Sequence, residues 1–145
     1  MRAGVLMLAG VAASLAAAPV QAGEVVITVT DLRSTKGVVR ACMTTRADIF
    51  PKCIKDPNAH RVVVPAAQKL EIRFTGVKPG QYAIALLHDE NNNNKADRAL
   101  MMMPKEGFGF SRDAKVRMGP PSFESAAFTV EGGTSSQSIR MRYLL

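Results

Sequence analysis

Residues 70–88 read LEIRFTGVKPGQYAIALLH, and this stretch decides the fold. In residues 70–75 apolar side chains alternate with polar ones, a period of two that is typical of a strand with one buried face. Residues 76–80, GVKPG, are typical of a tight connection. Residues 82–88 are almost continuously apolar, as in a central strand that is covered on both faces. We therefore predict two strands joined by a short turn.

The same alternation continues on both sides of this stretch. It recurs in residues 25–30, 38–43, 126–130 and 138–143. Short strands are also expected at Val62–Val64 and Ala99–Met103, and the turn residues Ser34–Gly37 predict a hairpin between the first two strands. No amphipathic helix of three turns follows residue 22. About seven strands with short turns predict an all-β fold, an antiparallel β-sandwich.

The first 22 residues have the features of a secretory signal. A single positive charge at Arg2 precedes an apolar stretch over residues 3–18, and small residues end the segment at Ala22. A retained membrane anchor is the alternative, but the apolar stretch is shorter than the roughly 20 residues that span a bilayer. We predict cleavage after Ala22, a single domain over residues 23–145, and a periplasmic or secreted protein.

The chain contains two cysteines, Cys42 and Cys53. In an oxidising compartment they can pair, and closing a loop of about 12 residues stabilises the fold by about 3 kcal/mol. Their spacing matches neither a zinc pattern nor a redox-active CxxC motif. A structural disulfide is therefore predicted, and two free thiols are the alternative.

The polar segment HDENNNNKAD at residues 88–97 carries the strongest chemical signal. Calcium takes six to eight oxygen ligands, which alternate residues of a tight loop can supply. The candidate ligands are Asp89, Asn91, Asn93, the carbonyl group of Lys95, and Asp97. Leu100 stands where a bidentate Glu would complete the loop, so the calcium site is expected to be weak. The alternative is a metal-free turn in which Asx side chains bond their own backbone.

Other residues give weaker signals for catalysis or metal binding. Met101–Met103 suggest copper(I), but neighbouring strand residues point to opposite faces, so packing is the better interpretation. His60 lies in an expected loop, and His88 and Asp89 are expected to point to opposite faces of a strand. The sequence contains no nucleophile elbow, zinc-protease or phosphate-loop motif. No catalytic residues are therefore predicted.

The net charge of the chain is +7. Its cations are scattered and few aromatic residues are interleaved with them, which argues against nucleic acid as a partner. The charge is compatible with weak contact to an anionic surface, such as lipid headgroups or polysaccharide.

Four motifs occur in order along the chain. They are GVKPGQY at 76–82, HDENNN at 88–93, PKEGFGFS at 104–111, and GPPSFE at 119–124 followed by Ala127 and Phe128. This set resembles an exported family of uncharacterised bacterial proteins, domain of unknown function 2141 (DUF2141), over residues 24–145. The resemblance implies an exported, single-domain, all-β protein with no assigned activity. The PG-x-Y strand before an Asp/Asn loop also looks like prealbumin-type and carboxypeptidase-regulatory sandwiches, an Ig-like architecture.

Together these features predict a non-enzymatic binding or structural module of the bacterial envelope. Its partner would be an unknown envelope component or a small ligand. The alternative is a metal-handling or hydrolytic periplasmic enzyme built on the long loops, which a buried pocket with His88 or His60 beside a carboxylate would favour. Phe108, Phe110 and Phe123 are expected to cap the core beneath a long loop, and a binding edge beside the acidic loop is the alternative.

Overall fold

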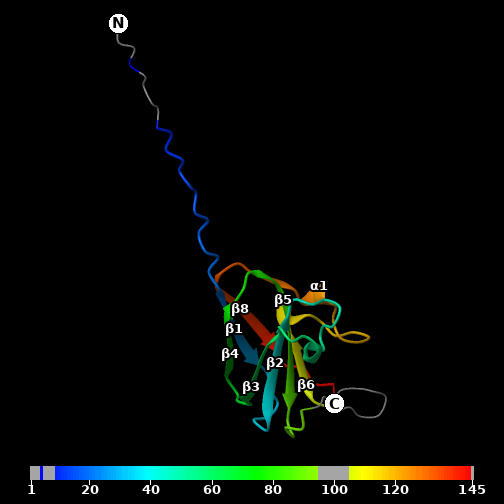
Figure 1. Ribbon diagram of the computed structural model, residues 1–145. Coiled ribbons are helices and arrows are strands. Elements are labelled where there is room, and N and C mark those ends of the chain that lie inside the picture. The colour runs from blue at the N-terminus through cyan, green and yellow to red at the C-terminus, as the bar shows by residue number, and fades with distance from the viewer. Residues whose placement is uncertain (1–3, 5–8, 95–104, 145) are drawn as a thin grey trace.

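Two β-sheets stack on each other in the computed structural model, which describes Gly4, residues 9–94 and residues 105–144 (Figure 1). The strands are β1 (Gly23–Thr30), β2 (Val38–Thr44), β3 (His60–Pro65), β4 (Leu70–Val77), β5 (Gly80–Asp89), β6 (Gly107–Phe110), β7 (Phe128–Val130) and β8 (Gly133–Arg140). One sheet has the order β4-β1-β8, and the other has the order β3-β2-β5-β6 with β7 also paired to β5. The predicted all-β sandwich is confirmed.

Alternating side chains from both sheets form the main core. The inward residues of β1, β4, β5 and β8 are apolar and buried, as their period of two predicts. They include Val25, Ile27, Val29, Ile72, Phe74, Tyr82, Ile84, Leu86 and Ile139. Burial of these side chains, at about 25 cal/mol per Å² of apolar surface, is the main force that holds the two sheets together.

A second apolar cluster covers part of the five-stranded sheet on the side away from the main core. Ala83 of β5 is buried there together with Phe110 and with Ala126 of the one-turn helix α1 (Phe123–Ala126). The ring of Phe50 lies 5.9 Å from that of Phe110 and 6.1 Å from that of Phe123. β5 is therefore covered on both faces, and the phenylalanines cap the sheet beneath long loops, as predicted.

The predicted hairpin between the first two strands is wrong. β1 pairs antiparallel with β4 and parallel with β8, whereas β2 pairs with β3 and β5 in the other sheet. Residues 31–37 therefore cross between sheets, and Leu32 is buried at the crossing. The physical reason is that the apolar faces of β1 and β2 cover the core from opposite sides.

Two further expectations differ from the observed elements. The strand expected over residues 126–130 begins at Phe128, because Ala126 ends the helix α1. The strand expected at Ala99–Met103 lies outside the described residues.

The C-terminal chain closes one side of the sandwich. After β8, Met141 still donates its amide proton to the Thr30 carbonyl group at 2.9 Å. Arg142 and Phe108 then exchange two main-chain hydrogen bonds of 2.8 and 3.0 Å, which attach the chain end to β6 of the other sheet. This step between sheets brings Tyr143 to the end of β5, beside the buried His88.

Residues 9–22 form neither helix nor strand and extend away from the domain (Figure 1). β1 begins directly after them at Gly23. Within the described ranges, no helix has the length and apolar character needed to cross a membrane.

Candidate functional site

The end of β5 brings three polar residues, His88, Asp89 and Glu90, to one end of the sandwich. Because successive strand residues point to opposite faces, His88 enters the main core and Asp89 faces the other side of the sheet. Both are fully buried. We call the region formed by these three residues, residues 31–37, residues 91–94 and Tyr143 the polar end.

The imidazole of His88 makes two hydrogen bonds inside the protein. Nε2 lies 2.8 Å from the carbonyl oxygen of Lys36, and Nδ1 lies 2.7 Å from the hydroxyl of Tyr143. A carbonyl oxygen only accepts, so Nε2 donates its proton to Lys36, and Nδ1 makes the second hydrogen bond with the Tyr143 hydroxyl. Both ring nitrogens are therefore occupied, and neither partner is a carboxylate.

Tyr143 is held on several sides. Its hydroxyl accepts the amide proton of Arg33 at 3.2 Å, and the Arg33 guanidinium lies 4.5 Å from the centre of its ring. Burial raises the pKa of the Tyr143 phenol. A Cβ atom at Gly107 would overlap the ring, so β6 needs glycine at this position. Tyr143 is thus a structural contact between the chain end, β5 and the crossing.

Glu90 pairs with residues of the crossing segment. Its carboxylate accepts hydrogen bonds from the Arg33 guanidinium at 3.0 Å and from the Ser34 hydroxyl at 2.7 Å. The hydrogen bond from Arg33, more than burial, determines the pKa of Glu90, which is lowered. The crossing is therefore fastened to β5 by an ion pair as well as by His88.

The Asp89 carboxylate organises the polar loop that follows β5. It accepts from Arg40 Nε at 2.8 Å and from the main-chain amides of Asn94 and Asn93 at 2.8 and 3.1 Å. Burial acts to raise the pKa of Asp89, but the Arg40 hydrogen bond and these amides together lower it. Asn92 and Asn94 have φ angles of 53° and 61°, a left-handed conformation that Asn tolerates well.

These contacts form an Asx turn, in which both Asp89 oxygens accept from N–H donors. Asn91 and Asn93 lie in the same turn, whereas Lys95 and Asp97 lie outside the described residues. In the described part of the chain, no three His, Cys, Asp or Glu side chains are placed to hold a metal ion. Calcium binding by the loop stays a prediction.

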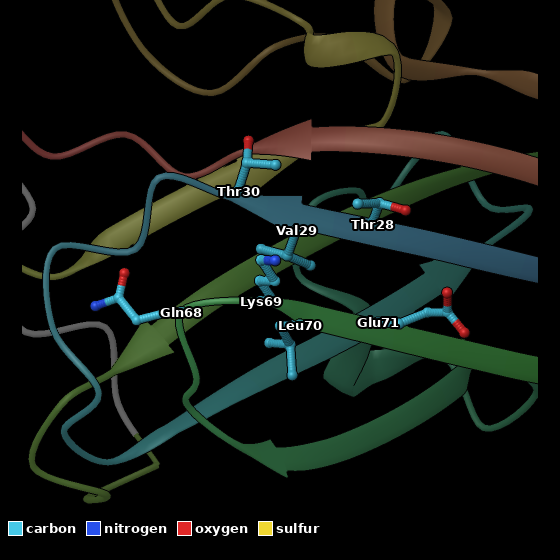
Figure 2. Close-up of a pocket in the computed structure, with 7 residues that line it drawn as sticks. All are labelled: Thr28, Val29, Thr30, Gln68, Lys69, Leu70 and Glu71. Carbon is cyan, nitrogen blue, oxygen red and sulfur yellow. The ribbon is translucent and has the colours of Figure 1, made fainter.

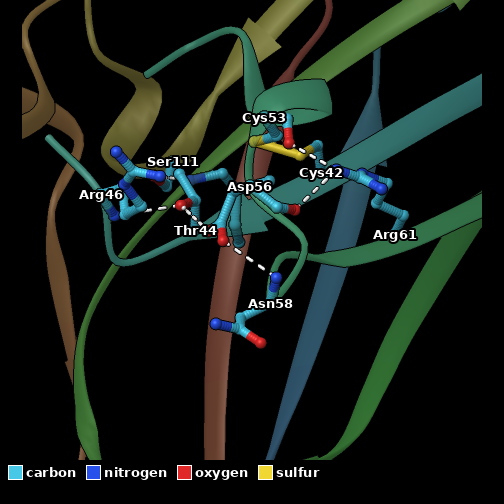
Figure 3. Close-up of a disulfide and its surroundings, with 9 residues drawn as sticks. Cys42, Thr44, Arg46, Cys53, Asp56, Asn58, Arg61 and Ser111 are labelled. Carbon is cyan, nitrogen blue, oxygen red and sulfur yellow. Dashed lines mark hydrogen bonds between the residues drawn. A yellow bond between two sulfur atoms is a disulfide. The ribbon is translucent and has the colours of Figure 1, made fainter. Parts of the chain in front are cut away.

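The predicted disulfide joins Cys42 of β2 to Cys53, with Cα atoms 6.0 Å apart (Figure 3). Cys53 begins a turn of 3-10 helix over Cys53–Lys55. The guanidinium of Arg61 donates to the main-chain carbonyl groups of Cys53 and Asp56 at 2.6 and 2.7 Å. The loop between β2 and β3 is therefore fixed by a covalent bond and by a cation.

Asp56 anchors the same loop, and the sequence reasoning did not identify it. This buried carboxylate accepts from the Thr44 hydroxyl at 2.6 Å and from the Asn58 amide at 2.9 Å (Figure 3). The Thr44 hydrogen bond, followed by that from Asn58, lowers the pKa of Asp56. The Asp-Pro-Asn sequence at residues 56–58 is a turn signal that could have indicated this role.

Ser111 is a second buried polar residue that sequence reasoning missed. Its hydroxyl accepts the amide proton of Ile84 at 2.9 Å and donates to the carbonyl oxygen of Ala126 at 2.5 Å. Both contacts are to the main chain, so this serine ties the segment around α1 to β5. No motif in the sequence marks such a long-range contact.

A shallow depression of about 280 Å³ lies at the end of β1 and the start of β4 (Figure 2). It is lined by Thr28, Val29, Thr30, Gln68, Lys69, Leu70 and Glu71. Neither histidine lies there. His60 was expected in a loop but begins β3, where its ring packs 5.8 Å from Phe74 and 6.1 Å from Tyr82. Among the residues described, neither histidine has the carboxylate partner that the enzyme alternative requires.

Comparison with known proteins gives one match. The family model of an uncharacterised protein conserved in bacteria (DUF2141) matches residues 27–138, which include the four motifs that suggested this resemblance. No curated protein and no solved structure matches the chain.

Proposed function

Since the chain belongs to DUF2141, a family of uncharacterised proteins conserved in bacteria whose description names no activity, we propose its function from its own structure. The protein is an exported, non-enzymatic binding module of the bacterial envelope. Its partner, an envelope component or a small ligand, contacts the loops at the ends of the sandwich. The sandwich itself is of the prealbumin or carboxypeptidase-regulatory type, which the Pro79–Tyr82 segment before an Asp/Asn loop supports.

The observation that supports this proposal is that buried polar side chains hold the loops of the domain in place by hydrogen bonds. Asp89 holds residues 93 and 94, Asp56 holds the disulfide-bonded loop, and Ser111 holds the segment around α1. Groups with these partners serve to fix loop conformations. A loop that is already fixed loses little conformational entropy when a partner binds, which favours recognition.

Export is supported by independent features. Residues 1–22 have the charge, apolar stretch and small final residue of a secretory signal. The first strand begins at Gly23, so removal of the preceding residues leaves every strand intact. The disulfide between Cys42 and Cys53 fits an oxidising compartment.

The test of export is the mass of the protein after expression of the full chain in bacteria. We expect the envelope fraction to contain residues 23–145 with the cysteines oxidised. Substitution Ala22→Arg should block cleavage and leave the longer chain, because the cleavage site requires a small residue. Recovery of the unprocessed parent protein from the cytoplasm would contradict the proposal.

The test of binding is native mass spectrometry of the same material. A non-covalently bound component is expected, and its loss after an exposed loop substitution such as Asn91→Ala would locate the contact. The hydrolytic alternative makes a different prediction. Turnover of ester or phosphoester substrates that His88→Gln abolishes would replace the binding proposal.

A further inference from the structure

A short exposed segment projects from the second apolar cluster. Val116 and Phe123 pack against that cluster. The chain between these two residues extends away from the cluster. Arg117 is exposed, and Met118 is fully exposed at 104%. We call Lys115, Arg117 and Met118 the basic tip. Figure 1 shows this segment, in yellow and orange, projecting beyond the sheets before α1.

The loop between β2 and β3 lies beside the basic tip's segment. Phe50 of that loop packs between Phe110 and Phe123, and Figure 1 shows the loop next to α1. Two residues after Phe50 the loop presents the exposed Lys52, and Lys55 follows. Two loops that are distant in sequence therefore contribute cations to one region of the surface.

Most acidic groups in these two segments are already engaged. Asp48 pairs with Arg46, Asp56 is buried against Thr44, and Asp113 faces Arg142 at 3.9 Å. In these two segments, five cations make no ion pair within the described residues, against one such carboxylate, Glu124. They are Lys52, Lys55, Arg112, Lys115 and Arg117. The region thus carries a local excess of positive charge.

The combination of charge and apolar exposure is unusual on this domain. Over the described strands and loops from Gly23 onward, the other exposed large apolar residues are Val63 and Leu144, with exposed fractions of 50% and 45%. Met118 is far more exposed and stands next to one cation and three residues from another. Transfer of a fully hydrated apolar side chain into an apolar phase is favourable and lowers the free energy of the system.

We propose that the basic tip docks the domain on an anionic lipid bilayer. Met118 enters the boundary between the headgroups and the acyl chains, while Lys115 and Arg117 lie against lipid phosphates. Lys52 and Lys55 add longer-range attraction. A soluble polyanion or polysaccharide would use the cations but offer no apolar phase to Met118, so the bilayer fits both features. The proposed export determines only which membrane the protein meets in the cell.

The first experiment measures partition of the oxidised protein, residues 23–145, onto phospholipid vesicles. Binding is expected with phosphatidylglycerol and phosphatidylcholine in equal parts, and not with phosphatidylcholine alone. Each cation near an anionic surface contributes about fivefold in partition, so Lys115→Glu with Arg117→Glu should weaken binding by at least about 25-fold. Added salt should weaken it as well, because exposed charges are screened.

The matched control is Lys69→Glu with Lys78→Glu, which makes the same change in net charge at exposed sites on other loops. This control should retain most of the binding of the parent. Equal losses in the two double variants would show that only net charge matters and would overturn the proposal, as would an absence of binding by the parent.

The second experiment tests the role of Met118 directly. The chain contains no tryptophan, so Met118→Trp introduces a single indole reporter. Its emission should shift to the blue with anionic vesicles and stay unchanged with dextran sulfate, a soluble polyanion. Binding to both without any shift would assign the site to polyanions and contradict the bilayer proposal. These measurements use purified protein, so their failure leaves the test of export unaffected.

Discussion

The hydroxyl of Tyr143 lies 2.7 Å from Nδ1 of the fully buried His88, whose Nε2 in turn lies 2.8 Å from the carbonyl oxygen of Lys36. One imidazole therefore joins the chain end to the segment that crosses between the two sheets. Nε2 donates to that carbonyl oxygen, and Nδ1 shares its hydrogen bond with the Tyr143 hydroxyl. This histidine fastens the fold, and its ring nitrogens have no spare capacity for a substrate.

Removing the Tyr143 hydroxyl tests this relationship. Tyr143→Phe leaves the ring in place but deprives Nδ1 of His88 of its hydrogen-bond partner, and an unsatisfied buried polar group costs about 1 to 3 kcal/mol. We expect the free energy of unfolding, measured with urea, to fall by this amount. Tyr82→Phe, which loses a contact to the more exposed carbonyl group of Lys78, is the control and should cost less. An unchanged urea midpoint in Tyr143→Phe would contradict the assignment.

Arg40 occupies the Asp89 carboxylate that a calcium ion bound in this loop would use. In the parent protein, the melting temperatures with millimolar calcium and with excess chelator should differ only slightly, because Arg40 and two amides already occupy Asp89 and the predicted site is weak. In Arg40→Gln the carboxylate loses its cation, so calcium should raise the melting temperature of that variant. A shift of several degrees in the parent would instead support the ion site of Asp89, Asn91, Asn93, Lys95 and Asp97.

The stability of the protein should fall in acid. The pKa values of Asp56, Asp89 and Glu90 are lowered in the folded state, so the unfolded chain binds more protons at low pH. Their contribution is complete above the ordinary carboxyl pKa of about 4 and is lost as the pH falls through the lower, folded-state values. Urea unfolding as a function of pH should show this decline. Asp89→Asn should flatten it, and an equally steep decline in that variant would exclude Asp89 as a contributor.

Reduction of the disulfide should destabilise the domain. The bond closes the loop between Cys42 and Cys53, and the loss of such a constraint on the unfolded chain costs about 3 kcal/mol. Thermal melting with dithiothreitol should show a lower melting temperature than melting without it. The variant with both cysteines changed to serine should melt at the lower temperature and no longer respond to the reductant.

The strands could be predicted from the sequence because alternation is a local property. Val25, Ile27 and Val29 are buried as their spacing indicates, and Ala83 is buried on the opposite face of β5, as expected for a central strand. The pairing of the strands could not be predicted in the same way. The turn residues Ser34–Gly37 suggest a hairpin. However, β1 and β2 lie in different sheets, because their apolar faces cover the core from opposite sides.

The candidate site was predictable only where a short motif marks it. The Asx-rich segment indicated a tight turn, and the two cysteines indicated their own pairing. By contrast, Ser111 contacts Ile84, and Tyr143 contacts His88, across long stretches of chain. Such contacts depend on the stacking of the sheets, so a single serine or tyrosine in the sequence gives no sign of them.

The parallel pairing of β1 with β8 determines when the three-stranded sheet can form during synthesis of the chain. β1 is the middle strand of its sheet, yet one of its two neighbours is β8, the last of the described strands in chain order. Until translation reaches residues 133–140, the growing polypeptide cannot complete this sheet.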